Sequence, residues 1–342
     1  MSTTQDNTRN AAMFASEQDT LNALRNVGYI TNAETAGTVF LAARLHKPIL
    51  LEGPAGAGKT EMAVAVHKAS GLPLIRLQCY AGITKDDAFG TFNAALQDFY
   101  VKSEGGQRGW QQVKKEIVSR DFFVPGPLLE ACECENGCVL LIDEIDKIPV
   151  AFEAMLLEFL SAWQLSIPGL GTVPARTVPF VVLTSNAERP IGYPIRRRSL
   201  FLLVEHPTAE AEATIVARKT PNCSPKTHLF IAGLASALRK YDGLEKPPSI
   251  SEMNDIAAAL ELLGKTEISE SDKATLLPLI AKTDADRGTL LMSGCFETIV
   301  RQAKADAEAI QKARAKGADS VQHDADAAHH EQKNEAAMAA NA

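Results

Sequence analysis

The stretch LLEGPAGAGKTEMA, at residues 50–63, constrains this chain more than any other part of its sequence. It matches the pattern G-x-x-x-x-G-K-[ST] in full, with an apolar run before it and a helical pattern after it. Glycines in such a turn allow backbone N–H groups to surround phosphate oxygens at the start of a helix. The stretch therefore predicts a phosphate cradle made of consecutive residues: Gly53, Pro54, Ala55, Gly56, Ala57, Gly58, Lys59 and Thr60.

Four side chains carry the chemistry that this cradle predicts. Lys59 is expected to hold the β- and γ-phosphates of ATP, and Thr60 to ligate Mg²⁺. A further acid for the metal is found in VLLIDEID, at residues 139–146. Asp143 ends the aliphatic run and is predicted to lie beside the Mg²⁺, which leaves Glu144 to polarise the attacking water.

Short apolar runs alternate with helical patterns in the first two-thirds of the chain. The runs occupy residues 48–52, 74–79, 138–143, 179–185 and 200–206. Buried strands separated by helices are typical of a parallel sheet covered on both faces. We therefore predict an α/β nucleotide-binding domain over residues 15–207, which begins with a helical segment interrupted at Gly28.

The strand signals stop after residue 207. Apolar residues then recur at three- and four-residue spacing, which predicts an all-helical domain over residues 208–311. The ends differ from both domains: residues 1–14 are polar and predicted to be flexible, and residues 312–342 form an Ala-rich tail with almost no large apolar side chain, which predicts disorder.

Composition excludes several classes of protein. The formal net charge of -7 argues against a general nucleic-acid binder. No apolar run approaches the length of a membrane span, and the N-terminus lacks the pattern of a signal peptide, so a cytoplasmic protein is expected. Cys132, Cys134 and Cys138 do not have the spacing of a zinc ribbon, and we interpret them as a helix end followed by a buried strand.

The order of GPAGAGKT, LLIDEID, VVLTSN and IRRRSLFL resembles that of the AAA+ ATPases, and within them the MoxR branch. The sequence is similar to CoxD-like proteins over about residues 20–300, most specifically in LLIDEIDKIPVAFEAMLLEFLSAWQLSIPGLGTVPA. The resemblance implies an AAA+ P-loop core with a five-stranded parallel sheet in the order 5-1-4-3-2. It also implies a C-terminal all-α lid and a homo-oligomeric ring, usually a hexamer.

The resemblance also implies roles for residues outside the cradle. Asn186 matches the sensor-1 position, where an amide can bond the attacking water and the γ-phosphate. Arg198 matches the arginine finger that reaches a neighbouring subunit, with Arg197 as the alternate, because a guanidinium suits the charge on a transferring phosphoryl group. Tyr29 and Ile30 match the segment that packs near adenine.

Three other segments carry expectations. WQLSIPGLGTVPARTVPFVVL predicts a hairpin around Pro168-Gly169, and FVPGPLLEA resembles the loop before the acid-bearing strand. The lid departs from MoxR relatives that carry a sensor-2 arginine, because KPPSISEMNDIA places Ser251 and Glu252 there, with Lys246 as a weak substitute. Asp146, shortly before Pro149, has the pattern of an ordinary helix start.

The complete motif set predicts an ATPase, and the resemblance implies a chaperone. Its client would be a metalloenzyme, such as a molybdenum hydroxylase, that receives a metal cofactor, and its partner a von Willebrand factor A domain protein. A Rubisco activase motor of the CbbQ type is an alternative with the same chemistry. A nucleic-acid-dependent AAA+ motor and a P-loop kinase for a small molecule are alternatives of other classes.

Overall fold

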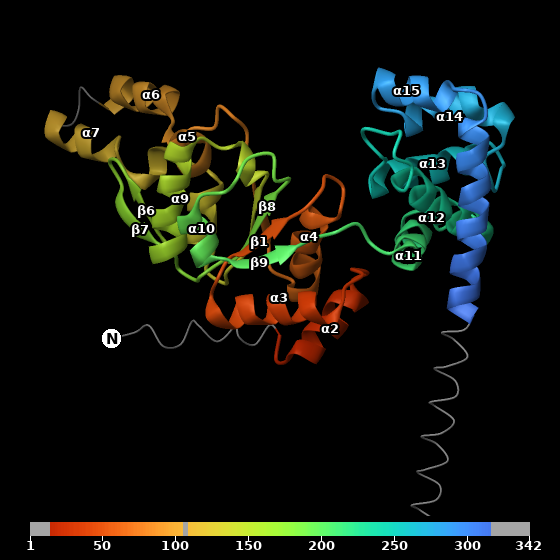
Figure 1. Cartoon of the computed structure of the whole chain (residues 1–342). Coiled ribbons are helices and arrows are strands. Elements are labelled where there is room, and N and C mark those ends of the chain that lie inside the picture. Colours follow the sequence, from red (N-terminus) through yellow and green to blue (C-terminus); the bar gives the residue numbers. More distant parts are fainter. Residues whose placement is uncertain (1–13, 105–108, 316–342) are drawn as a thin grey trace, which may run out of the picture. The chain divides into compact units, whose positions relative to one another are not determined.

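A five-stranded parallel sheet forms the centre of the first of two compact units, and the boundary between the units along the chain lies between Glu205 and His206 (Figure 1). The computed structural model describes residues 14–104 and 109–315. The strands are β1 (Ile49–Glu52), β2 (Leu74–Gln78), β5 (Val139–Asp143), β8 (Phe180–Ser185) and β9 (Leu200–Leu203). Their order across the sheet is β2-β5-β8-β1-β9. Counted along the chain, this is the predicted order 5-1-4-3-2, and the prediction is confirmed.

Both faces of the sheet are buried at its three central strands, β5, β8 and β1, and successive residues of each strand face opposite sides. Leu140 and Ile142 of β5 belong to one apolar cluster, and Val139 and Leu141 belong to the other. The first cluster includes residues of α8 (Pro127–Glu133) and α9 (Val150–Ala162). The second includes residues of α2 (Glu17–Asn26), α3 (Ala33–Leu45) and α4 (Lys59–Ser70). Apolar runs, rather than alternating patterns, follow from burial on both sides.

The helical interruption predicted at Gly28 is present. Ser16 and Asn32 cap α2 and α3 with side-chain oxygens, and between the helices Gly28 takes a φ of 92°, which glycine adopts at little cost.

The hairpin predicted around Pro168-Gly169 is also present. It is formed by β6 (Gln164–Ile167) and β7 (Gly171–Pro174), which pair antiparallel.

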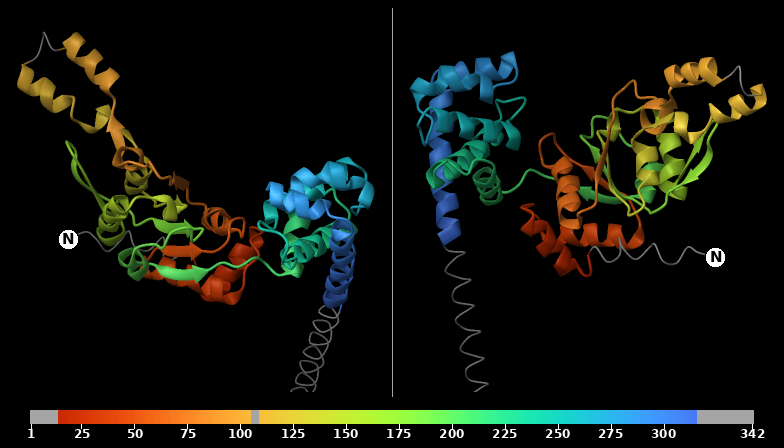
Figure 2. Two further views of the ribbon diagram at one scale, coloured as in Figure 1. Left: turned by 45° about the horizontal axis from the view of Figure 1, so that its top comes forward. Right: turned by 180° about the vertical axis from the view of Figure 1, so that it is seen from behind.

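A two-helix insertion interrupts the unit between short strands. It contains α6 (Ala94–Glu104) and α7 (Trp110–Glu116), which project away from the main sheet (Figures 1 and 2). The insertion follows α5 (Lys85–Phe89) and β3 (Gly90–Phe92), and it ends in η1 (Arg120–Phe122) and β4 (Phe123–Pro125). The expectation of a loop at FVPGPLLEA is wrong, because Val124 pairs with Thr91 in a β3-β4 ladder and Pro127 then opens α8.

The three cysteines lie where α8 gives way to β5. Cys132 and Cys138 are fully buried, and burial raises the pKa of the Cys132 thiol to about 12 and raises that of Cys138 as well. The interpretation as a helix end followed by a buried strand is confirmed.

The second unit is helical throughout its described part. Its helices are α11 (Ala209–Lys219), α12 (Pro225–Arg239), α13 (Ile250–Leu262), α14 (Lys273–Ile280), α15 (Asp284–Leu291), the short η3 (Glu270–Asp272) and a helix over residues 295–315. The last helix continues past the predicted boundary at 312, and Arg314 donates to the Glu210 carbonyl oxygen. Residues 1–13 and 316–342, which hold most of the two predicted flexible ends, lie outside the described residues.

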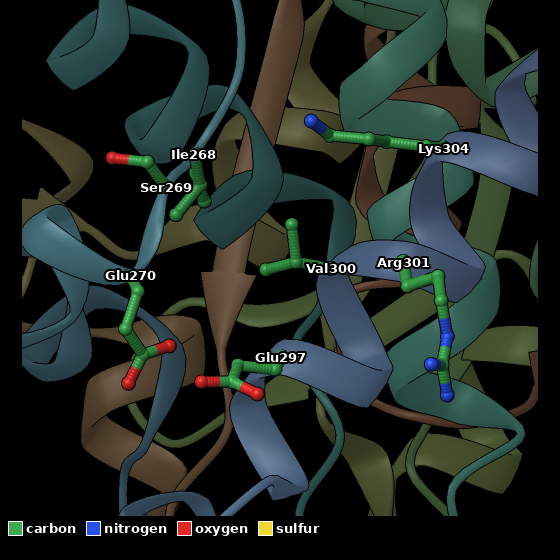
Figure 3. A pocket seen from close by; sticks show the side chains of 7 residues that line it. All are labelled: Ile268, Ser269, Glu270, Glu297, Val300, Arg301 and Lys304. Carbon is green, nitrogen blue, oxygen red and sulfur yellow. The ribbon is translucent and has the colours of Figure 1, made fainter.

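A shallow cleft of about 330 Å³ lies in this second unit (Figure 3). It is lined by Ile268, Ser269, Glu270, Glu297, Val300, Arg301 and Lys304. The cleft shares no residue with the cradle. Over residues 14–104 and 109–315, none of the helices has the length and apolar character needed to cross a bilayer.

Candidate active site

The predicted cradle connects β1 to α4 and has the backbone of an anion-binding turn. Gly56 and Gly58 take φ values of 73° and 92°, which turn successive N–H groups to one side. Gly53 is needed for another reason: a Cβ there would lie 2.0 Å from the carbonyl oxygen of Val204. The turn ends at the N-terminus of α4, whose dipole favours an anion.

Lys59 is the buried cation of this turn, with 6% of its surface exposed. Its Nζ donates to the carbonyl oxygens of Gly53 and Pro54, at 2.8 and 2.7 Å, and to Oδ1 of Asn186 at 2.7 Å. Burial lowers the pKa of Lys59, and the nearby carboxylates of Asp146, Asp143 and Glu144 oppose that shift. The structure thus brings Lys59 and the predicted sensor-1 amide of Asn186 into direct contact.

Asp143 and Thr60 meet at the carboxyl end of β5. The Thr60 hydroxyl lies 3.3 and 3.5 Å from the two carboxylate oxygens of Asp143, which is 3% exposed. Thr184 of β8 donates its hydroxyl to Asp143 Oδ1 and accepts the Glu144 N–H at 2.9 Å. Thr184 was not predicted from the sequence, although it stands two residues before Asn186.

Glu144 has a left-handed backbone, with φ of 59°. This conformation is costly for a residue with a side chain, and the N–H bond to Thr184 helps hold it. The Glu144 carboxylate accepts from Gln78 Nε2 at 3.0 Å and from Lys147 Nζ at 2.9 Å.

We expect Thr184→Val to remove both contacts while keeping the side-chain shape. The half-buried N–H of Glu144 and the buried Asp143 carboxylate then lose a partner, which should lower the free energy of unfolding by about 1–3 kcal/mol. Displacement of the acid pair should lower turnover by about 10- to 100-fold. Urea unfolding and steady-state ATP hydrolysis measure the two effects. The matched control is Thr177→Val, since Thr177 is also buried and bonds the Glu135 carbonyl oxygen; equal turnover in both variants would contradict the role of Thr184.

Asp146 does not cap a helix, so the expectation of ordinary helix-start chemistry is wrong. The residue that precedes α9 is Pro149, and no side chain caps this helix. The Asp146 carboxylate instead accepts from the N–H groups of Asn186 and Glu188, both at 3.1 Å. Its Oδ1 is buried and has no hydrogen-bond partner among the described residues. Asp146 therefore holds the backbone on either side of Ala187, next to the amide predicted to act as sensor 1.

Two polar residues of β2 complete the cluster and were also missed. Gln78 bonds Glu144, and Arg76 donates to Asp143 Oδ2 at 2.5 Å. They are two residues apart in LIRLQC, a run interpreted only as a buried strand. That spacing places both side chains on one face of β2, and β2 neighbours the acid-bearing β5.

The three arginines of α10 (Tyr193–Arg198) have different surroundings. Arg196 forms an ion pair with Glu52, with 2.5 Å between its guanidinium and the carboxylate. Arg198 donates to the Ser161 hydroxyl and the Pro194 carbonyl oxygen, whereas Arg197 lies over the ring of Tyr193. Arg197 and Arg198 are both exposed, and neither pairs with a carboxylate in the described part of the chain.

The residues predicted to lie near adenine and at the sensor-2 position do not take part in the contacts described above. Tyr29 and Ile30 are half-buried beside the core, and burial, with Glu61 nearby, raises the pKa of Tyr29 to about 12. Their contact with adenine stays a prediction. In the second unit, Ser251 and Lys246 are exposed, while Glu252 closes a capping box with Ser249 at the start of α13.

Comparison with known proteins agrees with this geometry. Residues 48–198 match the family model described as "AAA domain (dynein-related subfamily)". An uncharacterised protein of Staphylococcus epidermidis is 26% identical over 242 residues, which cover 69% of this chain and 81% of that protein. The gas vesicle ATPase GvpN2 of Halobacterium salinarum is 23% identical over 267 residues, covering 72% of this chain and 76% of that protein.

Among solved structures, a RuvB variant of Thermotoga maritima matches with a TM-score of 0.43 and 14% identity, over 77% of this chain and 70% of that one. The family match spans the cradle, the acid pair, Asn186 and the arginines of α10. Residues 48–198 thus carry the motifs of an AAA+ nucleotide-binding domain, and this match supports ATPase activity.

Proposed function

We propose that this ATPase is a chaperone of the MoxR type that uses ATP with Mg²⁺ to remodel a protein client. The observation that carries the proposal is the contact of the buried Lys59 with Asn186, near the carboxylates of Asp143 and Glu144. A water-polarising acid, a cradle lysine and an amide are the groups that phosphoryl transfer to water requires.

The donors present also fit a magnesium ion. The Thr60 hydroxyl and the Asp143 carboxylate are hard oxygen ligands within 3.5 Å of each other, beside a turn suited to phosphates. A bound Mg²⁺ supplies positive charge to the phosphates. Lys59 then neutralises phosphate charge, Glu144 takes up a proton from water, and Asn186 orients that water.

We further propose a homo-oligomeric ring, in which Arg197 or Arg198 completes the site of the next subunit. Two exposed arginines without a carboxylate partner among the described residues suit that role. The CoxD-like sequence favours a metalloenzyme client that receives a metal cofactor, together with a von Willebrand factor A domain protein.

Capture of the client tests this proposal. Glu144→Gln should bind ATP without hydrolysing it and retain its client. Lys59→Ala should not bind ATP and should therefore release the client. Tagged forms of both are purified from lysate with ATP, and the proteins enriched by the first variant are identified. A von Willebrand factor A domain protein with a metalloenzyme supports the proposal. Rubisco enrichment, or ATP hydrolysis stimulated by DNA, would instead support the other two motors.

A further inference from the structure

Arg76 is a charged residue in the middle of the edge strand β2, and its contacts lead into the acid cluster. One terminal nitrogen of its guanidinium donates to Asp143 Oδ2 at 2.5 Å and to Gln78 Oε1 at 2.6 Å. The two partners differ in exposure: the Arg76 side chain is 53% exposed, and that of Asp143 is 5% exposed. A solvent-accessible cation therefore lies against a buried carboxylate.

This contact uses the same carboxylate that the site offers to a metal. Asp143 Oδ1 accepts from Thr184, and Oδ2 accepts from Arg76, while the Thr60 hydroxyl lies near both oxygens. Within the described residues, Arg76 is the one cation at ion-pair distance from Asp143. A divalent cation that approaches Asp143 has to share the carboxylate with Arg76 or displace it, and two cations at one carboxylate repel each other.

We propose that Arg76 is a counter-cation that competes with Mg²⁺ for Asp143 and so sets the Mg²⁺ concentration at which the nucleotide site fills. This inference rests on the proposed use of Mg²⁺ with ATP. Arg76 is a positioning residue, because it acts on the site through Asp143. The exposure of its side chain allows it to withdraw into water, so its competition is moderate.

The pair also explains why an arginine, an unusual residue within a parallel strand, is tolerated in β2. The strand is at the edge of the sheet, and its carboxyl end faces the acid cluster. A purely structural pair between β2 and β5 would affect folding only. A competing cation would affect the response to Mg²⁺, and this difference can be measured.

The experiment is a Mg²⁺ titration of nucleotide binding in the full chain. A methylanthraniloyl analogue of ADP is used, so that hydrolysis does not enter, and its fluorescence is followed at fixed nucleotide concentration. Arg76→Gln should lower the Mg²⁺ midpoint by about 3- to 10-fold, because Asp143 is freed. Arg76→Lys keeps the charge and should shift the midpoint less.

The matched control is Arg120→Gln. Arg120 is 43% exposed and pairs with Glu133, outside the acid cluster, so this variant should keep the wild-type midpoint. An unchanged or raised midpoint in Arg76→Gln, with wild-type thermal unfolding, would overturn the proposal. Equal shifts in the glutamine and lysine variants would assign the effect to shape and contradict the charge argument. A wild-type chain without any Mg²⁺ response would instead refute the proposed Mg²⁺ site.

Discussion

Glu144→Gln should leave nucleotide binding close to wild type and lower the rate of ATP hydrolysis by at least about 100-fold. Glutamine has the same shape as glutamate but cannot take a proton from water. The left-handed backbone at Glu144 is held by the bond from its N–H to Thr184, which the substitution does not touch. Ground-state binding should persist because we propose Lys59 and the cradle glycines, not Glu144, as the groups that bind the phosphates.

The measurement combines steady-state phosphate release with a binding titration, each at saturating Mg²⁺. Glu188→Gln is the matched control, because it makes the same chemical change at an exposed acid in the loop after Asn186. Hydrolysis at the wild-type rate in Glu144→Gln would show that another group polarises the water. Loss of binding together with turnover would show that the substitution disturbs the cradle.

The sheet and the cradle could be predicted because their signals are local. The pattern from Gly53 to Thr60 specifies a turn between a strand and a helix, and the apolar runs specify strands buried on both faces. The roles of Asp143 and Glu144 could be predicted because these acids stand at the end of such a run. The sheet order came from family resemblance, since a run of apolar residues does not state which strand is its neighbour.

The residues that were missed act across strands. Thr184, Arg76 and Gln78 reach the acid pair from β8 and β2, the two neighbours of β5. Their roles depend on sheet order, which periodicity within one strand does not contain. With the order given, the period of two in β2 would have placed Arg76 and Gln78 at the acid pair.

The second unit shows the same distinction between local and distant information. SISE at residues 249–252 contains a capping box, a local pattern in which Ser249 and Glu252 satisfy each other's backbone N–H groups. The segment where the resemblance would place a sensor-2 arginine thus starts α13. The break at Gly294, where φ is 75°, divides α15 from the helix at 295–315, and the three- and four-residue spacing alone does not locate it.

Replacing Arg197 and Arg198 together with alanine should lower turnover by about 10³- to 10⁵-fold, the range expected for loss of an arginine finger. The two are tested together because each is exposed and neither pairs with a carboxylate in the part of the chain that the structure describes. Arg196 is left intact, since its ion pair with Glu52 fixes α10 next to the cradle. Single variants then assign the role to one arginine.

Mixing of subunits separates a role in the neighbour's site from a role in the same chain. The Arg197, Arg198 double variant keeps a complete cradle, and Lys59→Ala keeps both arginines, so a mixed ring contains some complete sites. Titrating one inactive variant into the other should restore turnover, with a maximum at intermediate ratios. In a control titration, Arg218→Ala, a change in the second unit, takes the place of the double variant and is mixed with Lys59→Ala. This mixture should show only the dilution of active subunits by inactive ones. If the double variant hydrolyses ATP normally, or if mixing restores nothing although the rings exchange subunits, the catalytic site lies within one chain and α10 has another role.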